Sequence, residues 1–305
     1  MGIHAFVLRS WQFLMIAVVG TVPISIPLAI GTYYATRERE PLTMLMFVPV
    51  FFLGVALLNV SAMRAVMRSW GVTGETDFVN LVKAVLRHAT LDTLLPLAAA
   101  AVVAALAALG LHYGLGAGLE LPGPFDPRRI PEMAGLISLF EARLPLDGAV
   151  MVNLLTIMPW VYPVILCLFG VSIAAGAANA SANPPGHLPV HAPGAKFWHI
   201  IAAIAVNGAL VALLAGGAGL GALWGIANQI EILPSIGFGA MGLILLIGYF
   251  SAYVVFALAY CVHEEEARAE RALISHLRRY GLKDESLDLR ALRTERMRGP
   301  ARPAG

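Results

Sequence analysis

Four prolines form the clearest spacing pattern in the chain. Pro23 and Pro27 lie four residues apart in the first long apolar stretch, and Pro159 and Pro163 repeat that spacing in the fourth. A proline inside a helix removes one hydrogen-bond donor and collides with the preceding turn. We therefore expect both helices to kink or unwind there and to free carbonyl groups. Interrupted helices at matching positions of two inverted halves build the substrate site of many secondary transporters.

The fourth apolar stretch is also the most polar of the six. Amides and hydroxyls elsewhere add to its polar groups, and together they either line a pathway or form hydrogen bonds between helices. No Asp, Glu, Lys or Arg lies within the apolar stretches, so hydrogen bonding between helices is the favoured interpretation. The polar residues outside the fourth stretch are Asn59, Ser61, Asn207, Tyr249, Ser251 and Tyr253. The candidates for a pathway or helix break are Pro23, Pro27, Asn153, Pro159, Tyr162 and Pro163.

No sequence motif for catalysis or cofactor binding is present. The chain contains no Gly-x-Ser-x-Gly, HExxH, CxxC or P-loop pattern. His187, His191 and His199 lie close in sequence, but prolines around the first two prevent a shared helical face, and no cysteine or carboxylate is near. We therefore expect no metal, no cofactor and no enzymatic activity.

Composition places the chain in a membrane. It has 305 residues, of which 58% are hydrophobic and 13% charged, whereas soluble domains carry roughly 25% charged residues. About 20 apolar residues are needed for one helical span, and lipid offers no partner for an unpaired backbone group. Six stretches are long enough to span: residues 13–34, 42–63, 94–113, 149–178, 200–227 and 236–262. These predict an all-α polytopic membrane protein with six transmembrane helices.

The basic residues predict the orientation of these spans. Arg64, Arg68, Lys83 and Arg87 lie between the second and third stretches, and nine arginines and one lysine follow the sixth. Because basic loops stay in the cytoplasm, we expect both termini inside. The arginines between 128 and 143 would then lie outside, which is the weakest point of this topology. The expected domains are a transmembrane domain, 1–262, and a charged cytoplasmic helical tail with a disordered end, 263–305.

Three further segments have the pattern of amphipathic helices. Residues 76–91, in the first cytoplasmic loop, place apolar side chains on one face and Lys83 and Arg87 on the other. Residues 131–143, in the second outer loop, show a similar stripe. The tail presents an apolar face through Leu273, Leu277 and Tyr280, which we expect to contact lipid or protein.

Small residues dominate the fifth stretch. Gly217, Gly221 and Gly225 follow a GxxxGxxxG pattern, and Gly208, Ala212 and Gly216 repeat the spacing on a nearby face. Small residues let helix backbones approach closely. We expect these faces to pack against other helices of the chain or against a neighbouring subunit.

The leading hypothesis is a non-enzymatic integral subunit of a larger complex in the bacterial inner membrane, such as a secretion or conjugation assembly. Its partners would be the lipid bilayer and other membrane or cytoplasmic subunits. The tail has one aromatic residue and no nucleic-acid-binding module, so we expect no nucleic acid. The alternative is a small-solute transporter or channel with proline-broken helices forming a midplane site.

Overall fold

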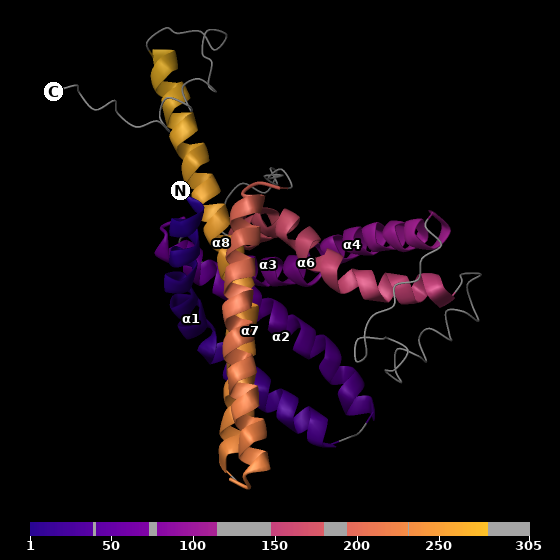
Figure 1. The fold of residues 1–305 in the computed structure, drawn as a ribbon. Coiled ribbons are helices and arrows are strands. Elements are labelled where there is room, and N and C mark those ends of the chain that lie inside the picture. The colour runs from indigo at the N-terminus through magenta and orange to yellow at the C-terminus, as the bar shows by residue number, and fades with distance from the viewer. Residues whose placement is uncertain (39–40, 73–77, 115–147, 180–193, 231, 280–305) are drawn as a thin grey trace, which may run out of the picture. The chain divides into compact units, whose positions relative to one another are not determined.

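The computed structural model describes residues 1–38, 41–72, 78–114, 148–179, 194–230 and 232–279. Within these ranges the chain is helical and has no strand (Figure 1). The helices are α1 (Ile3–Glu38), α2 (Pro41–Ser69), α3 (Phe78–Ala89), α4 (Leu91–Leu109), the short π-helix η1 (Gly110–Gly114), α6 (Gly148–Asn179), α7 (Phe197–Ala227) and α8 (Ile232–Arg279). The described segments include six helices long and apolar enough to cross a membrane, as predicted.

Large apolar side chains cover the outer surfaces of these helices. Leu8, Val19, Trp160 and Leu213 are each exposed over about two thirds of their surface or more. Soluble proteins rarely expose contiguous apolar patches beyond a few hundred Å², whereas a bilayer covers such surfaces with acyl chains. The exposed surface therefore fits a multi-pass membrane protein.

The helices extend beyond the uninterrupted apolar stretches. α2 continues through Arg64 to Ser69, and the third candidate span, Phe78–Gly114, joins α3, α4 and η1 and includes Asp92. The candidate spanning helices therefore include charged residues that lie just outside the apolar stretches, which themselves contain no Asp, Glu, Lys or Arg. The second apolar stretch ends next to a charged residue, Arg64, whereas the backbone hydrogen bonds of the helix continue beyond that residue.

Helix α8 supplies much of the core of the first compact unit, Met1–Cys261. Residues 254–261 are all buried. A Cβ on Gly170 of α6 would meet the Phe256 ring at 2.5 Å, and one on Gly237 would meet the α7 backbone at 2.8 Å. Elsewhere in this unit, α4 lies along α6, α1 lies along α2 and also contacts α7, and α3 contacts α2, α4 and α6.

The second compact unit, Val262–Gly305, contains the last turns of α8. Glu264 accepts a hydrogen bond from Arg268 at 3.2 Å, one helical turn away. The side chains of Leu273 and Leu277 lie outside the described part of the chain, as does Tyr280. The predicted outer-loop helix at 131–143 and the histidines at 187 and 191 also lie outside it.

Candidate functional site

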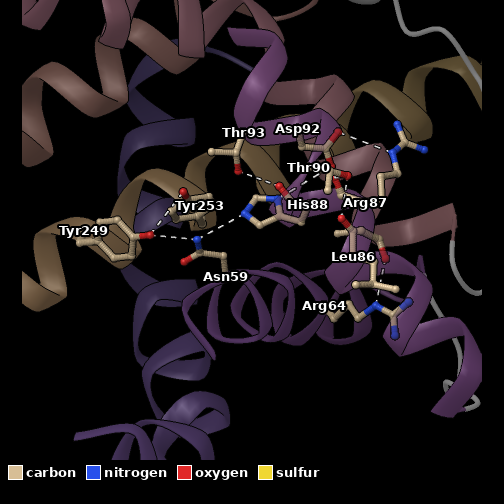
Figure 2. A network of polar contacts seen from close by, with 11 residues as sticks. Asn59, Arg64, Leu86, Arg87, His88, Thr90, Asp92, Thr93, Tyr249 and Tyr253 are labelled. Carbon is tan, nitrogen blue, oxygen red and sulfur yellow. Dashed lines mark hydrogen bonds and ion pairs between the residues drawn. The ribbon is translucent and has the colours of Figure 1, made fainter. Parts of the chain in front are cut away.

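A buried polar cluster connects three of the candidate spans (Figure 2). The amide nitrogen of Asn59, on α2, donates to the Tyr249 hydroxyl of α8 at 2.9 Å and lies 3.3 Å from Nε2 of His88 on α3. Tyr249 in turn donates to Tyr253 at 3.5 Å, and the Tyr253 ring meets the His88 ring edge-on, with centroids 5.6 Å apart. Asn59 and His88 are only 3% and 4% exposed, so protein rather than solvent surrounds this amide and imidazole.

A carboxylate completes the cluster on the other side of the imidazole. Oδ2 of Asp92, in the first turn of α4, lies 3.8 Å from Nδ1 of His88, and its Oδ1 lies 3.5 Å from Nε of Arg87. The carboxylate and the imidazole are both more than nine-tenths buried. A Cβ on Gly176 of α6 would lie 2.8 Å from Asp92 Oδ2, so only a glycine lets α6 come this close to the ion pair.

The corner between α3 and α4 brings these side chains together. The chain turns at Thr90, whose hydroxyl donates to the Leu86 carbonyl at 2.8 Å, while the Thr93 hydroxyl donates to the His88 carbonyl at 2.7 Å. The Thr93 bond satisfies a carbonyl that the end of α3 leaves without a helical partner, whereas the Leu86 carbonyl also accepts the Thr90 backbone N–H at 3.1 Å. The basic side chains lie at the carboxyl end of α3 and Asp92 lies at the amino end of α4, where helix dipoles favour each charge.

Arg64 connects α2 to the end of α6. It is 5% exposed, and its Nε donates to the Ala177 carbonyl at 2.9 Å, in the last turn of α6. Its two terminal nitrogens are buried without a hydrogen-bond partner in the described part of the chain. A cation at a helix carboxyl end interacts favourably with the dipole, so Arg64 caps α6 from a neighbouring helix.

Of the predicted pathway residues, one lies near this cluster. Tyr162, half-buried on α6, is close enough to Tyr249 and Tyr253 to interact with them electrostatically. Asn153 is buried on α6, before the first of its two prolines, Pro159. All four candidate prolines are exposed, and α1 and α6 continue as helices through them, so the prolines do not unwind these helices. α1 packs against α2 and α7, whereas α6 packs mainly against α4; kinks at these prolines and a shared midplane site stay predictions.

No family model matches this chain. No curated protein and no solved structure matches it either. Its function therefore has to be argued from its own residues. No group of three or more metal-ligating side chains comes together among the described residues. The cluster brings together an imidazole, a carboxylate and two phenols, groups that bind and pass protons.

The sequence does not identify His88, Asp92 and Arg64 as site residues, because all three lie in the segment predicted to connect the second and third spans. A signal was present: the basic end of one predicted helix is followed at once by Thr90 and Asp92, which is the pattern of a helix start. α3 and α4 meet at Thr90, and the packing of α2, α6 and α8 around this junction buries His88 and Asp92.

The outer face of α7 is a second candidate site, because its small residues are exposed in the part of the chain that the structure describes. Ala205, Gly208, Ala209, Ala212 and Gly216 recur every three or four residues, lie on one side of the helix and are all exposed. A Cβ on either glycine of this face would meet nothing within 4 Å.

The GxxxGxxxG stripe of α7 is enclosed by other described residues only at its carboxyl end. Gly225 is closed in by Leu233 and Pro234 of α8, while a Cβ on Gly217 or Gly221 would meet no atom within 4 Å. A packing role for Gly217 and Gly221 stays a prediction, and any partner would have to come from another molecule or from outside the described residues.

Proposed function

We propose that this protein is a non-enzymatic integral subunit of a larger assembly in the bacterial inner membrane, with a secretion or conjugation machine as its setting. The observation that carries the proposal is the unoccupied small-residue face of α7, formed by residues 205, 208, 209, 212 and 216. In lipid, association of helices gains nothing from water exclusion, so it depends on close packing of small residues and on hydrogen bonds. A face of leucine side chains would contact lipid equally well, but it would keep a neighbouring helix too far away for close packing of the backbones.

Composition supports the location. The chain is rich in glycine and proline, with 30 and 19 residues, and alanine and arginine are also frequent, which is typical of GC-rich bacterial genomes. Basic residues after the sixth span favour a cytoplasmic carboxyl end. A cytoplasmic helical tail would give the assembly a second contact, through the predicted face of Leu273, Leu277 and Tyr280.

Purification from native membranes in a mild detergent tests the proposal. We expect the wild-type protein to elute with other subunits, and Gly216→Leu to lose at least about nine tenths of them, since the side chain would hold the two backbones apart. Leu214→Phe is the matched control, because position 214 faces away from Ala212 on the same helix. A wild-type protein that elutes as a stable monomer with nothing bound would overturn the proposal.

The second candidate function is transport of a small solute or ion, which the polar cluster around His88 favours. Ionisable side chains within spanning helices are energetically expensive and commonly mark ion or proton pathways. Liposomes with an entrapped pH-sensitive dye test this candidate after an external pH step. The wild-type protein should acidify the liposome interior faster than His88→Gln does, and His112→Gln should match the wild-type rate. Equal rates for wild type and His88→Gln would remove the proton-coupled form of this candidate.

A further inference from the structure

We propose that His88 is a proton-binding site in the helical core and that the side-chain amide of Asn59 reorients when the proton binds. The ligand is a proton delivered by a hydronium ion: one O–H bond of the hydronium breaks and leaves water, and an N–H bond forms on Nε2, whose electron pair gives up its hydrogen bond from the Asn59 amide. The inference holds for either proposed function, because binding a proton requires neither transport nor a partner.

The hydrogen bonds of Asn59 define the unprotonated state. Its amide nitrogen has two hydrogens, and it faces the Tyr249 hydroxyl at 2.9 Å and Nε2 of His88 at 3.3 Å. Nε2 then accepts, so the neutral ring carries its hydrogen on Nδ1, the atom 3.8 Å from Asp92 Oδ2. The carbonyl oxygen of the same amide is buried and has no hydrogen-bond partner among the described residues.

Proton uptake by His88 reverses which end of the Asn59 amide, nitrogen or oxygen, is favoured next to the ring. A proton on Nε2 makes that atom a donor, and the amide nitrogen facing it is also a donor. A half-turn of the amide brings its oxygen against Nε2–H, and the Tyr249 hydroxyl then turns its single hydrogen from Tyr253 to the same amide oxygen. One end of the amide lacks a protein partner in either orientation, so the state of the imidazole decides between them.

The positive charge that His88 gains on protonation would lie next to one carboxylate among the charged and titratable groups around it. Asp92 of α4 faces Nδ1 and is shared with Arg87 of α3 itself. The cation on α2, Arg64, bonds to α6 rather than to this ring. The remaining groups are phenols, namely Tyr249 and Tyr253 of α8 and Tyr162 of α6. Arg87 and Asp92 together are neutral, so the bound proton gives the cluster one net positive charge, held beside a carboxylate.

Nitrogen NMR of the full-length protein in lipid nanodiscs tests this directly. The protein carries labelled histidine and asparagine, and His88 and Asn59 are assigned by the loss of their signals in His88→Gln and Asn59→Leu. We expect the Nδ1–H tautomer of His88 at alkaline pH, with protonation of Nε2 on acidification. The Asn59 amide signals should shift with the same midpoint as the ring signals.

The control is His112→Gln, in η1, which should leave both transitions unchanged. If His88→Gln fails to fold, His88→Asn replaces it for the assignment. An Nε2–H tautomer at alkaline pH would contradict the starting geometry. Asn59 signals that stay constant while His88 takes up its proton would overturn the proposed reorientation. Neither outcome depends on subunit co-purification or on flux, so failure here is separate from failure of the proposed functions.

Discussion

Helices α7 and α8 approach each other closely at Gly237. A Cβ at this position would lie 2.7 Å from the Ala222 Cβ and 2.8 Å from the Ala218 carbonyl oxygen. Ordinary contacts begin at 3.4 Å, so Gly237→Ala forces the two backbones apart by about 0.6 Å. A gap of that size forfeits about a quarter or more of the dispersion energy of the atom pairs along the interface.

Opposing effects set the size of the change. Alanine is favoured over glycine in a helix by about 0.8–1 kcal/mol, whereas overpacking a well-packed contact costs about 1–3 kcal/mol. The clash here involves backbone atoms, which cannot move independently of their helix, so the cost lies toward the upper end. We expect Gly237→Ala to lower the free energy of unfolding by about 1–2 kcal/mol.

Gly239 on the same helix provides the matched control. A Cβ at this position would meet nothing within 4 Å, so Gly239→Ala keeps the gain of helix propensity, up to about 1 kcal/mol. Unfolding in mixed micelles with increasing sodium dodecyl sulfate, followed by tryptophan fluorescence, measures both variants. A Gly237→Ala protein as stable as Gly239→Ala would refute the close packing of these helices.

Three further predictions use the same unfolding measurement. Arg64→Ala should destabilise the protein by about 1–3 kcal/mol, because it leaves a buried carbonyl at the end of α6 unpaired; an unchanged midpoint would contradict the capping role. Gly176→Ala should push the Asp92 carboxylate away from its partners, so Asp92→Asn should cost less in that background than alone, and full additivity would argue against it. Asn207→Ala and Ser10→Ala should show a coupling energy of about 0.6 kcal/mol, since the Asn207 amide donates to the Ser10 hydroxyl at 3.3 Å between α7 and α1; zero coupling would exclude that bond.

The spanning helices were predictable because lipid leaves few alternatives. A continuous apolar stretch in a bilayer must satisfy its backbone internally, so length and hydropathy suffice to locate it. Helix ends were less predictable, since charged residues such as Arg64 end an apolar stretch without ending a helix. The prolines show the same limit, because α1 and α6 remain helical through positions such as Pro23 and Pro163. In lipid, breaking a helix exposes several polar groups, which costs more than losing the one bond that proline removes.

The polar cluster was predictable only in part. Asn59 and Tyr249 belong to the polar residues that the sequence identifies, but they lie 190 positions apart and nothing in the local pattern pairs them. His88 and Asp92 lie together because α3 and α4 meet at a corner. How deeply that corner is buried depends on which helices pack around it, and the local sequence does not show this. Gly176 is one such determinant: its missing side chain lets α6 cover the ion pair, and a single glycine in an alanine-rich helix gives no sign of that role.

Placement of the ionisable groups at helix ends explains how a membrane domain can hold them. An isolated buried charge is strongly unfavourable, but Arg87 and His88 at the carboxyl end of α3 and Asp92 at the amino end of α4 each interact with a helix dipole of opposite sign. The Thr93 hydroxyl satisfies the His88 carbonyl, which the corner would otherwise leave unpaired. The corner thus supplies part of the compensation that a counter-ion would provide. An imidazole can therefore stay beside Asn59 with one ring nitrogen accepting, and a proton added to that nitrogen meets a carboxylate that is already in place.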